Sequence, residues 1–422
     1  MSSAELAAGA GPGPPGRGML SNFVWAVAGN VVFAACQWGI VVALAKAGST
    51  TMVGQFSLGI AIATPILMFS NCDLRAVQAT DANHDFDFLE YVRLRAITTT
   101  LAFGAISLVA YLGRYGTQTA LIIAAVGIAK AVEAFSDVHY GLFLLNGRLD
   151  RTGCSMMLRG VLAVIGMTAA LVITGDVLRG CLAIGIVWFA VLVGFDMPRA
   201  RVLIRQASAA RGTVQRLWML TRIALPMGIV TTVASVNLQI PRYFVHAWLG
   251  DRNLGIFSAL AYTTVAMTLV GDSLGQCVVS RLSRLFAEGH RAKFAAHIRL
   301  LLLMASVVGV GGIAIVHLYG SRLLRLIYSP EYAAHSHVFA LLTVGAAIHF
   351  VASMLTVAIT ATRNFVVQVP MYVAMAVCTA VGCARWIPAW GLQGAAFAVI
   401  GGAVVRLMVA AGVMCHVCGG SS

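Results

Sequence analysis

The sequence predicts an all-α protein that crosses a membrane many times. Of its 422 residues, 59% are hydrophobic and only 10% are charged, and the mean hydropathy is +0.88. Soluble domains carry roughly 25% charged residues, so these values exclude a soluble fold. Apolar runs recur along the chain, and each is long enough to cross a bilayer as a helix.

Twelve of these runs are predicted as transmembrane helices, six in each half of the chain, and the segments between them are too short for a soluble domain. Their boundaries are approximate and lie at roughly 21–45, 52–72, 92–113, 117–145, 152–175, 178–196, 218–249, 254–280, 297–319, 333–361, 366–385 and 391–415.

The two ends of the chain carry no recognisable site. Residues 1–20 are rich in Gly and Pro and are predicted to be a disordered cytoplasmic tail, since no basic cluster precedes an apolar core as in a signal peptide. Cys415 and Cys418 form a CxxC without a second pair of metal ligands. No metal and no cofactor are therefore predicted.

The net charge of +14 is explained by its distribution along the chain. With both termini in the cytoplasm, eighteen of the 29 Lys and Arg residues lie on the cytoplasmic side, seven lie outside and four lie within helices. Arg75 and Arg95 count among the eighteen. This asymmetry follows the positive-inside rule. The charge therefore indicates orientation, and no nucleic acid is expected as a partner.

Two short repeats predict an internal duplication. GQFS at 54–57 opens the second helix and GIFS at 255–258 opens the eighth; LRG at 178–180 and LQG at 392–394 precede the sixth and twelfth. Such repeats favour two six-helix lobes of the same orientation, related by a pseudo-twofold axis along the membrane normal.

The predicted lobes are joined by a charged bridge. The N-lobe comprises residues 21–196, and the C-lobe comprises residues 218–416. The segment 197–217 between them, which is rich in arginine, is predicted to be a cytoplasmic linker. It reads either as an ordinary positive-inside loop or as a contact for anionic lipid.

Charged residues inside the fourth helix are the main candidates for function. Lys130, Glu133 and Asp137 share one helix face. A charge near mid-membrane costs roughly 2.5–3.5 kcal/mol, so it has to face protein or a water-filled cavity. Lys130 and Glu133 either form a pair that only joins helices, or belong to a stripe that lines a lumen between the lobes. We favour the lumen, because Asp137 needs another partner. Arg159, at the same depth in the next helix, is the predicted one.

Three further charged residues are weaker candidates. Arg242 follows Pro241, which is expected to kink or break the seventh helix. Its guanidinium suits phosphate or carboxylate, although arginine near a helix end also snorkels to the interface. The same alternative holds for Arg75, near the end of the second helix. Asp272, in the eighth helix, either pairs with neighbouring arginines or couples transport to an ion.

The chain resembles the Wzx-type flippases of lipid-linked oligosaccharides, which share a superfamily (MOP) with the MATE multidrug exporters. The resemblance is carried by residues 54–81, 130–141, 155–160, 239–244 and 254–262. It implies a MATE-like, V-shaped bundle in the bacterial inner membrane. It also implies alternating access through a cationic lumen, to which Arg75, Lys130, Arg159 and Arg242 would contribute.

The expected function is to move an undecaprenyl-diphosphate-linked oligosaccharide to the periplasmic leaflet, for O-antigen or exopolysaccharide biosynthesis. No enzyme activity is expected. No nucleotide-binding motif is present in the sequence, so the coupling ion would be a proton or sodium, carried by Glu133, Asp137 or Asp272. Membrane lipids, a polymerase and a chain-length regulator of the same pathway are the further expected partners.

Two alternative functions remain at this stage. The first is an ion-coupled MATE exporter of small molecules. It is disfavoured because the first helix contains no acid and buried cations repel cationic drugs. The second is a membrane-embedded polysaccharide polymerase or glycosyltransferase. It is disfavoured because the predicted outer loops are short.

Overall fold

The structure is a computed structural model that describes residues 19–81, 85–204, 214–362 and 367–419, without the side chains of 19, 20, 23, 263–277, 280 and 417–419. Every element in these ranges is a helix. The N-terminal half contains α2 (Met19–Ala47), α3 (Thr50–Asn71), α4 (Leu74–Thr80), α5 (Phe88–Leu112), α6 (Thr117–Leu145), α7 (Leu149–Thr174), α8 (Val177–Val191), the π-helical turn η1 (Leu192–Asp196) and α9 (Met197–Arg201). The C-terminal half contains α10 (Val214–Ala287), α11 (Arg291–Ile327), α12 (Pro330–Ala333), α13 (Ser336–Ala361), α14 (Gln368–Trp390) and α15 (Leu392–Gly419).

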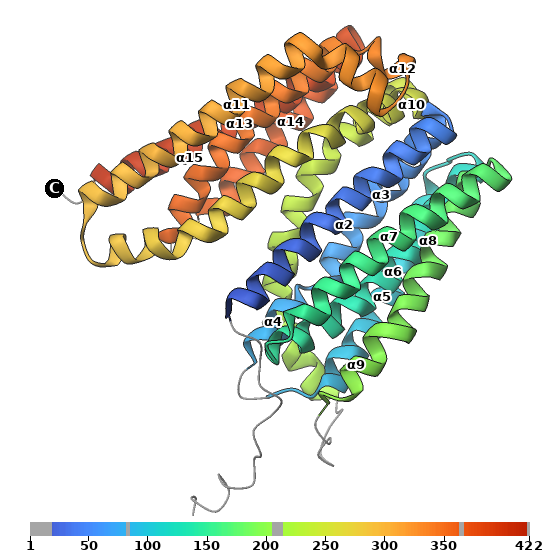
Figure 1. Ribbon diagram of the computed structural model, residues 1–422, viewed down its shortest axis with the longest axis horizontal. Helices are drawn as coiled ribbons and strands as arrows, with labels where there is room; N and C mark the ends of the chain where they lie inside the picture. Colours follow the sequence, from blue (N-terminus) through green and yellow to red (C-terminus); the bar gives the residue numbers. More distant parts are fainter. Residues whose placement is uncertain (1–18, 82–84, 205–213, 363–366, 420–422) are drawn as a thin grey trace, which may run out of the picture.

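The predicted twelve-helix fold is confirmed. In the described residues, 11 helices are long and apolar enough to cross a membrane. One of them, α10, contains a sharp reversal at Gly250, whose φ of 77° lies in the left-handed region that glycine adopts readily. Because its two limbs run in opposite directions (Figure 1), α10 supplies both the seventh and the eighth predicted helix.

Local capping signals set several helix boundaries. α5 begins at Phe88, four residues before the predicted start, because Asp87 and Glu90 form a reciprocal capping box there. The Ser49 hydroxyl accepts a hydrogen bond from the Met52 amide at the start of α3. Residues 88–91, which the predicted boundary left outside the helix, therefore form its first turn.

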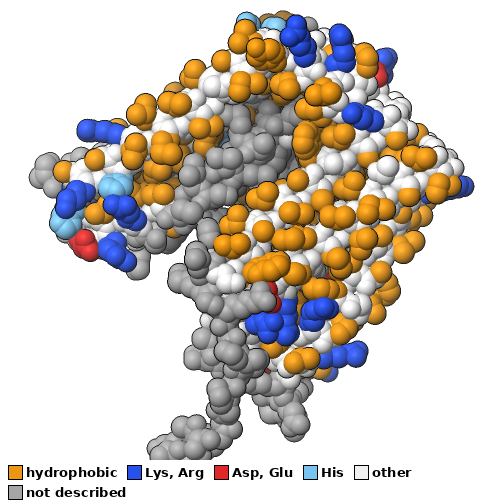
Figure 2. Space-filling model, in the orientation of Figure 1, with side chains coloured by type: hydrophobic (Ala, Val, Ile, Leu, Met, Phe, Trp, Pro, Cys, Tyr) orange, Lys and Arg blue, Asp and Glu red, His pale blue; other side chains and the backbone are white. Residues whose placement is uncertain are grey.

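The two lobes form a V (Figure 1). They meet at one end, which we call the junction end, where α10 reverses and α12 lies. They diverge toward the other, the linker end, where α2 begins and α9 ends. In Figure 2, hydrophobic side chains cover the flanks of both lobes on this face. Such flanks suit a hydrocarbon environment.

The first limb of α10 bridges the lobes. It packs along α3 of the N-lobe: the Tyr243 hydroxyl donates to the Ala61 carbonyl, and Gly228 lies against Cys72. The same limb also reaches the C-lobe, where the Asn237 side-chain amide donates to the Tyr372 carbonyl at 2.7 Å. The limb that opens the C-terminal half therefore holds both lobes.

The junction end has a reciprocal contact between the two halves. A Cβ on Gly54 would overlap the carbonyl of Asp251, and a Cβ on Gly255 would overlap the carbonyl of Thr50. The duplication aligns Thr50 with Asp251 and Gly54 with Gly255. The two contacts are therefore related as a pseudo-twofold axis requires, which supports the predicted relation between the lobes.

Side chains reinforce this junction. The Trp38 indole of α2 donates to the hydroxyl of Tyr328 at 2.9 Å. The Thr50 hydroxyl donates to Glu331 at 3.3 Å, and Arg252 pairs with the same carboxylate at 2.7 Å. Hydrogen bonds thus connect the N-lobe to the C-lobe at the junction end.

Candidate functional site

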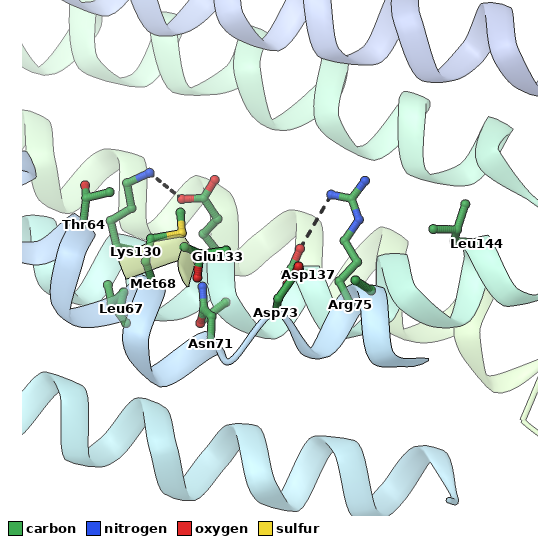
Figure 3. A pocket seen from close by; sticks show the side chains of 13 residues that line it. Thr64, Leu67, Met68, Asn71, Asp73, Arg75, Lys130, Glu133, Asp137 and Leu144 are labelled. Atoms are coloured by element: carbon green, nitrogen blue, oxygen red, sulfur yellow. Dashed lines mark hydrogen bonds and ion pairs between the residues drawn. The ribbon is translucent and has the colours of Figure 1, made fainter. Parts of the chain in front are cut away.

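A cavity of about 360 Å³ lies in the linker-end half of the N-lobe, against the charged face of α6 (Figure 3). It is lined by residues of α3, α4 and α6, by Asp73 between α3 and α4, and by Thr231 of the first limb of α10. Lys130, Glu133 and Asp137 all line it. The three residues therefore share one helix face that lines a cavity, while the lumen between the lobes that they were expected to line stays a prediction.

A break between α3 and α4 brings a further charge to the cavity. Cys72 and Asp73 have φ values of 47° and 45°, in the left-handed region of backbone conformation that residues other than glycine rarely adopt. After the break, α4 packs closely against α6 at Gly141, where a Cβ would overlap the side chain of Gln78 from α4. This places Arg75 beside the α6 stripe.

Glu133 lies between two cations. Its Oε2 accepts a hydrogen bond from Lys130 Nζ at 2.7 Å, and its Oε1 lies 3.5 Å from Arg159 Nη2. Arg159 also donates to the Tyr140 hydroxyl at 3.1 Å, and its guanidinium lies 4.7 Å from the centre of the Trp188 ring. The pair of Lys130 with Glu133, one of the two alternatives from the sequence, is present in the structure, and Arg159 completes the group.

Asp137 also lies between two cations. Its Oδ1 is 3.7 Å from Arg75 Nη1, and its Oδ2 is 3.2 Å from Arg95 Nη2. The predicted pairing of Asp137 with Arg159 is therefore wrong. Arg159 contacts Glu133 instead, which lies about one helical turn before Asp137 on α6. The rotation of α6 directs Glu133 toward α7 and Asp137 toward α4 and α5, and depth alone does not specify rotation.

Arg95 is the site residue that the sequence analysis missed. It belongs to the helix predicted at 92–113 and was counted with the basic residues of the cytoplasmic side, yet in the structure it is fully buried in α5 and donates to the Asn71 side chain as well as to Asp137. The capping box of α5, Asp87 with Glu90, was the available signal. It starts the helix four residues earlier than predicted, so Arg95 lies about one turn further from the helix end than the predicted boundary indicates.

Arg242 and Asp272 are not brought to this cavity by any described contact. Arg242 donates to Gln239 at 2.6 Å, and its guanidinium lies 5.5 Å from the centre of the Tyr262 ring, nearer the junction end. Of the kink or break expected at Pro241, the break does not occur, since α10 stays helical there and reverses at Gly250 instead. The side chain of Asp272, like that of Cys418, lies outside the described residues.

The charges around the cavity are nearly balanced. Its lining contains the carboxylates of Asp73, Glu133 and Asp137 and the cations of Arg75 and Lys130. With the two buried arginines behind the carboxylates, the group has four cations and three anions. The positive charge expected in a lumen is therefore present here, but most of it is already paired.

Comparisons with known proteins agree with this architecture. No protein-family model matches the sequence. The chain is 24% identical over 384 residues to the capsular polysaccharide biosynthesis protein CapF of Staphylococcus aureus. The aligned region covers 90% of this chain and 95% of that protein.

Two solved structures are similar over nearly the whole chain. The lipid II flippase MurJ in an inward closed conformation superposes with a TM-score of 0.74 at 11% identity, over 93% of this chain and 87% of its own. An inward-facing MATE multidrug resistance transporter of the MOP superfamily superposes with a TM-score of 0.70 at 13% identity, over 92% and 96%. The chain therefore has the fold of the MOP transporter superfamily, as its resemblance to Wzx-type flippases predicts.

Proposed function

We propose that this protein moves an undecaprenyl-diphosphate-linked oligosaccharide from the cytoplasmic to the periplasmic leaflet of a bacterial inner membrane. One observation carries the proposal: two accessible cations, Lys130 and Arg75, line a cavity inside a transporter fold. The ammonium group of a lysine, on its flexible side chain, and the planar guanidinium of an arginine are both suited to binding phosphate groups. The similarity to a protein named for capsular polysaccharide biosynthesis supports a glycan as the transported group.

The proposed orientation has both termini in the cytoplasm. The linker end, toward which the lobes diverge, then faces the cytoplasm, and the cavity lies where a lipid made on that side would enter. The excess of basic residues on this side supports the assignment. A phosphatase fused after Cys418 should be inactive and a fluorescent protein fluorescent; the reverse pattern would overturn the orientation.

The proposed driving force is a proton or sodium gradient. Glu133 and Asp137 are the described carboxylates of the α6 stripe, and an acid in the membrane interior is a usual ion carrier. In proteoliposomes with an imposed pH gradient, Glu133→Gln should lose the response to the gradient and keep downhill flipping. A normal response in this variant would leave Asp272 as the next candidate.

Reconstitution into proteoliposomes tests the function itself. Flipping of a defined undecaprenyl-diphosphate-linked oligosaccharide is followed by its accessibility to a membrane-impermeant glycosidase. Because each loses a charged contact to phosphate, Lys130→Ala and Arg75→Ala should each slow flipping about tenfold or more. The matched controls are Lys46→Ala and Arg322→Ala, which remove exposed cations elsewhere and should leave the rate unchanged. Wild-type vesicles that do not flip this lipid would contradict the proposal.

The alternative of a MATE-type exporter has one observation in its favour, the three carboxylates in the cavity lining. A cationic drug would have to compete there with the four cations that are already paired with Glu133 and Asp137. Export of a fluorescent cationic dye from the same vesicles, without flipping of the glycolipid, would favour this alternative. We also propose a polymerase and a chain-length regulator of the same pathway as partners, which co-purification from the membrane would test.

A further inference from the structure

The two carboxylates of the cavity share one arrangement. In each of them one oxygen faces a cation that lines the cavity, and the other oxygen faces an arginine behind it. For Glu133 the two cations are Lys130 at 2.7 Å and Arg159 at 3.5 Å. For Asp137 they are Arg75 at 3.7 Å and Arg95 at 3.2 Å.

Exposure separates the four cations into two classes. The side chains of Lys130 and Arg75 are 24% and 37% exposed, whereas those of Arg159 and Arg95 are 2% and 0% exposed. We call Lys130 and Arg75 the cavity cations and Arg159 and Arg95 the anchor arginines. Only the cavity cations are accessible to a ligand inside the cavity.

The anchor arginines are fixed by other groups besides the carboxylates. Arg159 donates to the Tyr140 hydroxyl at 3.1 Å and lies over the rings of Trp188 and Phe33. Arg95 donates to the side chain of Asn71. Moving either guanidinium would break these contacts in a dry interior, where a lost hydrogen bond is costly. The anchor arginines are therefore expected to stay in place when the cavity cations move.

We propose that Arg95 and Arg159 are positioning residues that keep Asp137 and Glu133 paired while Arg75 and Lys130 leave them to bind a diphosphate. This inference rests on the proposed function and specifies how its site recognises the substrate. The anchor arginines balance the charge of each carboxylate after the cavity cation has gone. Without them, release of a cavity cation would leave an unpaired carboxylate inside the membrane.

The arrangement also selects the headgroup. Two cavity cations, on α6 and on α4, are each held by a carboxylate, and these carboxylates lie one helical turn apart on α6. A ligand with two phosphate groups engages both cations at once, whereas one with a single phosphate engages one. The site should therefore bind a prenyl diphosphate more tightly than the corresponding monophosphate.

Binding of farnesyl diphosphate to the full chain in lipid nanodiscs tests the inference. Removing an anchor should weaken binding, because the carboxylate then retains its cavity cation. Arg159→Met should raise Kd about tenfold or more. The double variant Glu133→Gln/Arg159→Met removes the competing carboxylate as well, and its Kd should return to within about threefold of wild type. The same pattern is expected at the second carboxylate, where Asp137 holds Arg75. Arg95→Met should weaken binding, and Asp137→Asn/Arg95→Met should restore it.

Rescue by the second substitution separates positioning from packing. If Arg159 served only to fill space among its aromatic neighbours, Glu133→Gln would not restore binding to Arg159→Met. Arg159→Lys keeps the positive charge, so its Kd for farnesyl diphosphate should be close to that of the wild type. This variant still tests the role of the charge if Arg159→Met fails to fold. Farnesyl monophosphate, as the comparison ligand, should bind more weakly than the diphosphate and lose less affinity in each anchor variant.

The outcomes distinguish this inference from the proposed function. If the wild-type protein flips the glycolipid and binds farnesyl diphosphate but the double variants stay as weak as the single ones, the anchor role is wrong and the function stands. An unchanged Kd in Arg159→Met also overturns it. If the wild-type protein neither flips the glycolipid nor binds the diphosphate, both proposals fail.

Discussion

Asp137 shows how far single residues could be assigned from the sequence. The spacing of Lys130, Glu133 and Asp137 specified the shared face of α6, because helical periodicity is a local property. The partners of Asp137 were not local. They depended on the rotation of α6 against α4 and α5, and on the packing of α5 that buries Arg95. Intramembrane charges indicated that partners exist, but the sequence did not identify them.

The pairing of Asp137 with a buried arginine predicts a loss of stability when the acid is neutralised. Asp137→Asn leaves the fully buried Arg95 without its carboxylate, which should cost about 3 kcal/mol. The control is Asp176→Asn, at a partly exposed pair with Arg179 whose atoms are 3.9 Å apart; because asparagine can also serve as the N-cap that Asp176 provides for α8, it should cost less than about 1 kcal/mol. Thermal unfolding in detergent measures both. Equal melting temperatures for the two variants would show that Arg95 does not depend on Asp137.

At the scale of helices, the repeated sequence GQFS and GIFS predicted a duplication but not its purpose. The structure places Gly54 and Gly255 where the two halves cross closely, each against a carbonyl of the other half. A glycine at both positions lets two helix backbones approach in the membrane. Hydropathy predicted both limbs of α10, yet not that the first would pack along α3, because tertiary contacts determine that choice.

The glycine crossing predicts a shift between conformations. Gly54→Ala and Gly255→Ala introduce a methyl group where a backbone carbonyl lies, so each should open the junction end. Ser258, fully buried in α10, reports this opening when it is replaced by cysteine in a cysteine-free background. Labelling of Ser258→Cys by a membrane-impermeant maleimide should rise in both glycine variants. Gly104→Ala, in α5 with open space around it, is the control. No rise in the glycine variants would show that the junction accommodates the methyl group.

At the scale of the whole molecule, the cavity and the junction lie at different levels of one V. The cavity belongs to the linker-end half of the N-lobe, whereas hydrogen bonds of Trp38 and Thr50 connect the lobes at the junction end. Transport by alternating access requires the lobes to separate at the junction and meet at the linker end. The binding groups and the closing contacts are therefore separable, and it should be possible to block one without the other.

A cross-link across the junction tests this separation. A short, cleavable bifunctional maleimide that joins Thr50→Cys to Glu331→Cys, whose native side chains are hydrogen-bonded at 3.3 Å, ties the two lobes together. It should abolish flipping in proteoliposomes but leave the Kd for farnesyl diphosphate unchanged, and cleavage should restore flipping. The control joins Gln55→Cys to Thr119→Cys, native partners at 3.1 Å within the N-lobe, and should not slow transport. Flipping that continues with the Thr50–Glu331 link intact would show that the junction stays closed throughout transport, so the lipid would have to leave by another route.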